Sequence, residues 1–326
     1  MIMAITINNI DYTVVDTKEK MTVPDCFVKR SNKILFGNGE AKFYIGNDSL
    51  ELRSFFGERG FRINCFVLRK DLRQYLLDCK AEYLNPEQPY KKQSSMPSLW
   101  QERMYIVEEL DEILWFDLLE QTQIAGPRVY VKSYDKAYDL IRELSLPNIT
   151  YLSAIKLKAP NGEIVFDFRL FVDYFGDVEH PSEIENEVEL IKEEDLPEEE
   201  EQELTKARKG QGKYRKALLD ECPICPITQV SDDRLLIASH IKPWVKSDIN
   251  EKTDPKNGFM FTPTYDFLFD RGFITFTDDK KIKVSPWLSK MTCSKLNIAE
   301  EKKYSMLPTE GREHYLEYHR NKVFKS

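Results

Sequence analysis

One stretch near the C-terminal end of the sequence constrains the fold more than any other. An apolar run over residues 235–239 ends at His240, and Asn257-Gly258 stands before a second apolar run over residues 259–261. A third segment begins at Asp266 and continues with apolar residues. Short apolar runs bounded by turn residues are typical of strands, and the third segment is typical of a helix. The sequence therefore predicts two strands and a helix, with one His, one Asn and one Asp where the pattern changes.

These three residue types suit the hydrolysis of a phosphodiester bond. His240 is the predicted general base, because a neutral imidazole can take a proton from the attacking water. Asn257 is the predicted orienting residue, whose amide can hold the loop between the strands. Asp266 is the predicted ligand of a divalent metal ion, Mg²⁺ or Mn²⁺. The structural alternatives are a histidine at a strand end, an ordinary Asn-Gly turn and an Asp helix cap.

The same residues resemble the HNH endonuclease family, whose ββα-metal fold carries its site on a hairpin and one helix. The likeness is closest to a subgroup with Ser-His-Ile-x-Pro-Trp at 239–244, Asn-Gly at 257–258 and Leu-Phe-Asp-Arg-Gly at 268–272. It covers roughly residues 208–290 and includes Gly-Gln-Gly-Lys-Tyr-Arg at 210–215. The resemblance implies a metal-dependent endonuclease that acts on DNA.

The chain departs from the family pattern at two positions. Asp266 stands where the family often has its last His, so the site is better written His-Asn-Asp. Ser239 stands where many members place a metal ligand before the base, and a hydroxyl is a poor cation ligand. Asp270, four residues after Asp266 and on the same helix face, is the nearest candidate to complete the metal site. Three basic residues are predicted to contact DNA phosphates, with ordinary surface charge as the alternative: Lys242, Arg215 and Arg271.

The cysteines do not form a disulfide framework. Among the six, only Cys222 and Cys225 are close in sequence, which agrees with a reducing compartment. Their spacing could supply half of a structural Zn²⁺ site, but no second cysteine pair follows to complete the four ligands. We therefore favour two small apolar residues packed beneath the hairpin over a zinc site.

Charge divides the chain into three parts. Residues 183–203 contain twelve acidic residues and one Lys, whereas residues 204–326 contain 23 basic and 16 acidic residues. Like charges extend a chain, so the acidic stretch predicts a linker or a solvated helix, with a nucleic-acid mimic as the alternative. We expect a DNA-recognition or regulatory domain at 1–182, an acidic linker at 183–205 and an HNH nuclease domain at 206–326. The basic charge of the last part suits a phosphate-backbone binder.

The N-terminal part predicts a mixed α/β module, which makes the whole chain α+β. Strand-like runs occupy residues 12–15, 33–36, 42–45, 128–132 and 163–172. Apolar residues recur every three or four positions at 67–83, 103–121 and 135–145, which predicts helices.

The predicted protein is a DNA endonuclease. A cytoplasmic location is expected, since the sequence shows neither a signal peptide nor an apolar run long enough for a membrane helix. A restriction or phage-defence enzyme is the favoured interpretation. A homing or mobile-element endonuclease is one alternative, and a DNA-binding module that no longer cuts is another. Cutting both strands requires two sites, so a homodimer is expected unless the product is a nick.

Overall fold

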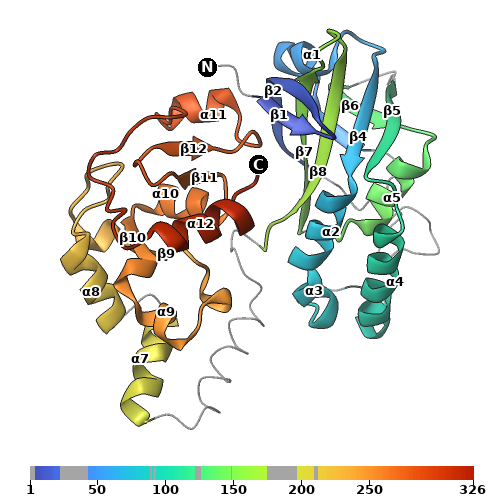
Figure 1. Cartoon of the computed structure of the whole chain (residues 1–326). Helices are drawn as coiled ribbons and strands as arrows, with labels where there is room; N and C mark the ends of the chain where they lie inside the picture. Colours follow the sequence, from blue (N-terminus) through green and yellow to red (C-terminus); the bar gives the residue numbers. More distant parts are fainter. Residues whose placement is uncertain are drawn as a thin grey trace. The chain divides into compact units, whose positions relative to one another are not determined.

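The computed structural model describes residues 4–22, 43–88, 90, 93–121, 126–147, 149–174, 197–208 and 212–326. The chain divides into two compact units, Met1–His180 and Pro181–Ser326. Figure 1 shows a large sheet with helices in the first unit, and short strand pairs among helices in the second. The α+β class predicted from the sequence is confirmed.

The first unit is built on an eight-stranded sheet in the order β1-β2-β7-β8-β4-β5-β6-β3. Neighbouring strands are antiparallel except β4 and β8, which are parallel. The strands are β1 Ala4–Ile7, β2 Ile10–Thr22, β3 Phe43–Asn47, β4 Arg62–Leu68, β5 Ile113–Gln121, β6 Arg128–Lys132, β7 Thr150–Lys158 and β8 Ile164–Val172.

The described helices of this unit place apolar side chains in its core. They are α1 Leu50–Phe56, α2 Arg69–Asp78, α3 Lys80–Leu84, α4 Met96–Glu108 and α5 Lys136–Leu144. In α5, Tyr138, Ile141 and Leu144 recur every third position and are all buried. In β8, Phe166 and Phe168 enter the same core from alternate positions. The helical period and the strand alternation therefore meet in one apolar core.

The predicted helix over 103–121 is wrong in its second half. α4 ends at Glu108, and β5 begins at Ile113. Within β5, Phe116 and Leu118 are buried whereas Trp115 is exposed, so the burial alternates as in a strand. Over a few residues, a mixed apolar run fits the helical period as well as the strand alternation. The segment forms a strand because it pairs with the full length of β4.

The second unit carries the predicted hairpin and helix. β9 Ile237–His240 pairs antiparallel with β10 Gly258–Phe261, and α10 Pro263–Asp270 follows. Its other elements are α7 Glu198–Arg208, α8 Lys213–Glu221, α9 Ile249–Thr253, β11 Ile274–Phe276, β12 Ile282–Val284, α11 Lys290–Lys295 and α12 Glu313–Lys322. The apolar side chains of both strand pairs, α8, α10 and α12 form one core cluster.

α10 begins earlier than the sequence pattern predicted. Its N-cap is Thr262 and its first residue is Pro263, so Asp266 lies in the first turn and does not cap the helix. Proline suits this first position because its ring fixes a helical φ and its missing N–H would have no partner there. The start at Pro263 also places Asp266 and Asp270 within the same short helix.

Two predicted features fall partly outside the described residues. The strand over 33–36 lies outside them, as does most of the acidic stretch, residues 183–196. The remainder of that stretch belongs to α7, and Leu204 is buried in the core of the second unit. The domain limits and the linker stay predictions. In the part of the chain that the structure describes, no helix has the length and apolar character to cross a bilayer.

Candidate active site

His240 ends β9 and is held on several sides. Its ring stacks on the Tyr214 ring, with centroids 4.4 Å apart and planes 13° from parallel. The Trp244 ring approaches edge-on at 5.6 Å. The Nε2 atom lies 3.1 Å from the backbone carbonyl oxygen of Lys252, which follows in α9. The imidazole is half-buried in this position.

The Lys252 carbonyl determines the tautomer of His240. A carbonyl oxygen only accepts hydrogen bonds, so the Nε2 atom must carry the proton that it donates. In the neutral ring, Nδ1 then carries the lone pair. A general base needs a nitrogen with a lone pair, and this tautomer leaves that lone pair on Nδ1.

Asn257 is fully buried and bonds across the loop between the two strands. Its Oδ1 accepts from the Lys242 N–H at 2.8 Å. Its Nδ2 donates to the Lys242 carbonyl at 3.3 Å, the Ser247 hydroxyl at 3.2 Å and the Glu251 carbonyl at 3.1 Å. Because Glu251 directly precedes Lys252, this amide also fixes the carbonyl that His240 meets.

The Asn257-Gly258 pair is not the simple turn that its sequence suggests. Asn257 ends a 3-10 turn, and Gly258 has φ −164° and ψ 166°, so it is extended and begins β10. Its reason for being glycine is space: a Cβ there would lie 2.3 Å from the Tyr214 hydroxyl oxygen and 2.9 Å from a Leu218 methyl carbon.

The two carboxylates of α10 meet at Ser239. The Ser239 hydroxyl donates to Asp270 Oδ1 at 3.2 Å and also interacts with the Asp266 carboxylate. Ser239 and His240 are neighbours in β9, so adjacent residues carry the contacts to the carboxylates and the imidazole. The structure thus forms two groups, an imidazole group and a carboxylate group, joined by one peptide bond.

Asp266 occupies an unfavourable position for a charge. Burial raises the pKa of Asp266 to about 6, although the hydrogen bond from Ser239 lowers it in part. Its Oδ1 atom is buried and has no hydrogen-bond partner. An ionised carboxylate in such a place is stabilised by a cation. The hard oxygens of Asp266 and Asp270 are ligands that Mg²⁺ or Mn²⁺ accepts, so the residues present fit the predicted metal.

The three predicted phosphate contacts have partners within the protein. Arg215 donates to the carbonyls of Leu236 at 2.9 Å and Asp233 at 2.6 Å, which fixes the turn before β9. Arg271 is 6% exposed and its guanidinium lies 4.3 Å from the Phe267 ring centroid. Lys242 forms an ion pair with Glu251, and its side chain is 19% exposed. Contact of these cations with DNA stays a prediction.

Cys222 and Cys225 are both buried. The Cys222 thiol lies 3.4 Å from the Ile224 carbonyl, and Cys225 Sγ accepts from the Thr228 N–H at 3.5 Å. Burial raises the pKa of the Cys222 thiol. The zinc interpretation stays untested; within the described ranges no group of three or more His, Cys, Asp or Glu side chains could hold a metal ion.

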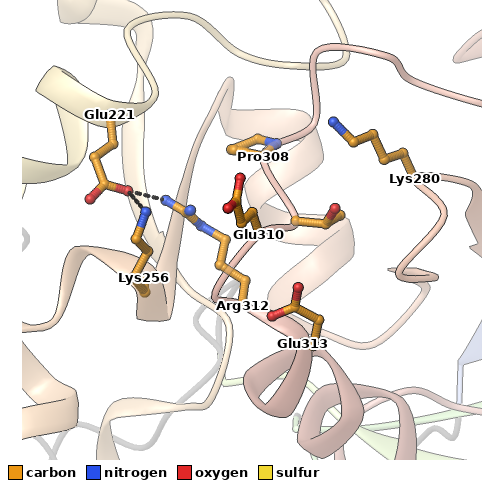
Figure 2. A pocket seen from close by; sticks show the side chains of 8 residues that line it. Glu221, Lys256, Lys280, Pro308, Glu310, Arg312 and Glu313 are labelled. Carbon is orange, nitrogen blue, oxygen red and sulfur yellow. Dashed lines mark hydrogen bonds and ion pairs between the residues drawn. The ribbon is translucent and has the colours of Figure 1, made fainter.

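A buried arginine supports the turn that carries Asn257, and the sequence offered no signal for it. Arg312 is 1% exposed; its Nε donates to the Gly258 carbonyl at 3.0 Å, and its Nη2 to the Pro255 carbonyl at 3.1 Å and Glu221 at 3.0 Å. A pocket of about 530 Å³ lies beside it (Figure 2). Its charged lining residues are Glu221, Glu310, Glu313, Lys256, Lys280 and Arg312. Acids and bases balance, so the pocket has no evident preference for phosphate.

The hairpin, the following helix and the fixed histidine are the arrangement that the sequence predicted, and a family comparison bears on their class. Residues 225–277 match the family model of the HNH endonucleases. The second unit therefore carries a segment of the HNH endonuclease type, which suggests a nuclease. The match includes His240, Asn257 and Asp266, while Tyr214 and Arg312 lie outside it. No curated protein matches the chain.

Proposed function

We propose that this protein is a metal-dependent DNA endonuclease in which His240 is the general base and Asn257 holds its loop. The observation that carries the proposal is the contact between His240 Nε2 and the Lys252 carbonyl at 3.1 Å. It assigns the proton to one nitrogen and the lone pair to the other. In the proposed reaction, His240 Nδ1 takes a proton from the water that attacks phosphorus.

Asp266 and Asp270 are the proposed ligands of the divalent cation, Mg²⁺ or Mn²⁺, with Ser239 holding both carboxylates. The buried and unpartnered Oδ1 of Asp266 supports this role. When bound, such a cation stabilises negative charge on the scissile phosphate and the leaving 3′ oxygen. The protein's own contribution is to hold the carboxylates in the first and last turns of a short helix packed against β9.

Lys242 is the best supported of the proposed phosphate contacts. It follows His240 by two residues, and a phosphate would offer its ammonium group an alternative to Glu251. For Arg215, the contacts with the Leu236 and Asp233 carbonyls support a second role in holding the local backbone, and for Arg271 the contact with the Phe267 ring supports a role in packing.

The N-terminal unit is proposed to select the DNA that the HNH domain cuts, as in a restriction or phage-defence enzyme. Its separate core and the basic charge of the C-terminal part support this division. A homing endonuclease would use the same chemistry. A single HNH domain per chain implies a nick, or a double-strand cut by a proposed homodimer.

The test is cleavage of supercoiled plasmid by the full chain with Mg²⁺, Mn²⁺ or EDTA. We expect cleavage with either metal, none with EDTA, and a loss of about 100- to 10,000-fold in His240→Ala. His314→Ala, at an exposed histidine of α12, is the matched control and should cleave normally. DNA binding without cleavage under either cation would identify the inactive module instead. Modified and unmodified substrates then distinguish restriction from homing enzymes.

A further inference from the structure

Tyr214 covers one face of the predicted base. It lies in the first turn of α8, in a segment 26 residues before His240 and outside the matched HNH span. Its ring is 2% exposed and stacks on the imidazole at 4.4 Å and 13°. With Trp244 against the ring edge and the Lys252 carbonyl at Nε2, the imidazole has little freedom to rotate.

The Tyr214 hydroxyl is anchored at the residue that directly precedes the opposite strand of the hairpin. It donates to the Asn257 carbonyl at 3.3 Å. The next residue, Gly258, pairs directly with His240, and a Cβ on it would lie 2.3 Å from the hydroxyl oxygen. Because the extended backbone of Gly258 suits any residue, glycine is required here by its close neighbours, of which the Tyr214 hydroxyl is the nearest and a Leu218 methyl carbon, at 2.9 Å, the next. The absence of a side chain at Gly258 thus leaves room for the Tyr214 side chain.

The chemistry of Tyr214 suits support of the base. Burial raises the pKa of the Tyr214 phenol far above its ordinary value, so the group stays neutral. A neutral phenol ring presents the negative face of its π-system to the imidazole. This face attracts the imidazolium that forms once His240 has taken a proton. The ring also opposes the rotation that would break the contact with Lys252.

We propose that Tyr214 is a positioning residue for His240 and that Gly258 is the residue that makes room for it. This inference rests on the proposed nuclease function. By stacking on the imidazole, the Tyr214 ring keeps His240 Nε2 at the Lys252 carbonyl, so that Nδ1 faces the attacking water of the proposed reaction.

Two substitutions separate the ring from the hydroxyl. Tyr214→Phe keeps the stacked ring and should retain kcat within about threefold, whereas Tyr214→Leu should lower kcat about 10- to 100-fold with KM unchanged. The matched control is Tyr304→Leu, which removes a ring buried in the same core cluster and lying against Lys302. Equal kcat losses in Tyr214→Leu and Tyr304→Leu, measured on folded protein, would show a merely structural role and overturn the proposal.

A double-mutant cycle tests the role of Gly258. Gly258→Ala in the natural chain should lower kcat as much as Tyr214→Leu, because the new methyl group displaces the ring. In the Tyr214→Phe background the same substitution should cost at least about threefold less, since the oxygen closest to the methyl group is gone. Equal costs in the two backgrounds would mean that the glycine serves Leu218 or the strand backbone, and the proposed pairing of Tyr214 with Gly258 would fail.

The tautomer of His240 can be measured without any cleavage. In ¹⁵N spectra of the metal-free full chain at pH 8, we expect the Nε2–H form in the natural protein, Tyr214→Phe and Tyr304→Leu. Tyr214→Leu should show averaged Nδ1 and Nε2 signals of a mobile ring. An unchanged tautomer in Tyr214→Leu contradicts the inference. If the tautomer behaves as expected but the natural protein cleaves no DNA, the positioning by Tyr214 holds and the proposed nuclease function fails.

Discussion

The imidazole group and the carboxylate group of the candidate site differ in how completely the protein satisfies them. His240 is surrounded by Tyr214, Trp244 and the Lys252 carbonyl. Asp266 has a buried oxygen without a hydrogen-bond partner and a pKa raised by burial to about 6. The protein alone therefore fixes the imidazole, whereas Asp266 keeps one unsatisfied oxygen. In the proposed nuclease, the imidazole group is the preorganised half of the site, and the carboxylate group is the half that a cation completes.

The largest effect should come from removing the side-chain amide of Asn257, which holds the loop between β9 and β10 beside His240. Asn257→Ala leaves several buried backbone groups without partners, so we expect a loss of roughly 3 kcal/mol in the free energy of unfolding. Urea denaturation of the metal-free protein measures it. Asn257→Asp is the informative companion, because its carboxylate can accept from the Lys242 N–H but cannot donate to the Glu251 carbonyl. A loss in Asn257→Asp no greater than that at an exposed asparagine would contradict the role of the amide donors.

Asp266→Asn should break the carboxylate group while leaving the imidazole group intact. We expect cleavage to fall roughly 100-fold, because an amide is a poorer ligand for a hard cation. The folded-state pKa of Asp266 lies above its unfolded value, so stability is lost as pH rises through about 6.

The same substitution should therefore stabilise the metal-free protein at pH 8, by roughly 1–2 kcal/mol after allowance for solvent screening. Thermal unfolding in EDTA measures the gain. The control is Asp279→Asn, whose carboxylate is exposed and has its pKa lowered by hydrogen bonds from Thr277 and Lys281. A stabilised Asp279→Asn or a destabilised Asp266→Asn would contradict the assignment of burial as the cause.

His319 provides a pH test of the helix that carries the carboxylates. Its Nε2 donates to the Phe269 carbonyl of α10 at 3.0 Å, and its Nδ1 lies 2.9 Å from the Thr275 hydroxyl. Burial lowers the pKa of His319 to about 3 from an ordinary 6.5. Below pH 6.5 the His319 imidazole is protonated in the unfolded chain but stays neutral in the folded chain. The free energy of unfolding therefore decreases as the pH is lowered.

At pH 5 this one group should cost about 2 kcal/mol relative to pH 8. Urea unfolding at both pH values measures the loss, and His319→Gln should remove that part of the pH dependence. An unchanged slope in His319→Gln would assign the dependence to other groups.

Ser239→Ala should have the smallest effect. The Ser239 hydroxyl bonds to Asp270 and keeps the pKa of Asp266 lower than burial alone would set it. Its removal should therefore leave the carboxylates less ordered and raise the pKa of Asp266. We expect the Mn²⁺ concentration for half-maximal cleavage to rise roughly threefold to tenfold, the equivalent of about 1 kcal/mol or one ordinary hydrogen bond. Ser289→Ala, at another buried serine of the same unit, is the control. An unchanged Mn²⁺ requirement would leave Ser239 without a role in holding the metal ligands.

The local elements of the site could be predicted from the sequence because each has a short and distinct pattern. The runs before His240 and after Asn257 form the two paired strands, and Asp266 lies in the helix that follows. The start of that helix was misplaced by three residues, since Thr262-Pro263 caps it and the apolar pattern begins only later. In the N-terminal unit, the sequence pattern predicts helix where β5 lies, because the pairing of β5 with β4 is a long-range contact that a local pattern does not contain.

Other features had no local signal. The Lys252 carbonyl is a backbone group, and no residue type announces it. Arg312 looks like any charged residue at the start of a helix, yet it is buried against the turn of Asn257. Gly258 carried a misleading signal, since Asn-Gly suggests a turn while the structure needs glycine for contact with Tyr214. Each of these depends on which distant segments meet in space.

The burial of Asn257 has a consequence for the chemical durability of the protein. An Asn-Gly pair in a flexible chain readily loses its side-chain amide, because the glycine nitrogen attacks the amide carbon and closes a five-membered ring. Here Asn257 is wholly buried, and its amide is held at both the oxygen and the nitrogen. Ageing by deamidation should then require prior opening of the loop, and storage conditions that favour the native state should also preserve this amide.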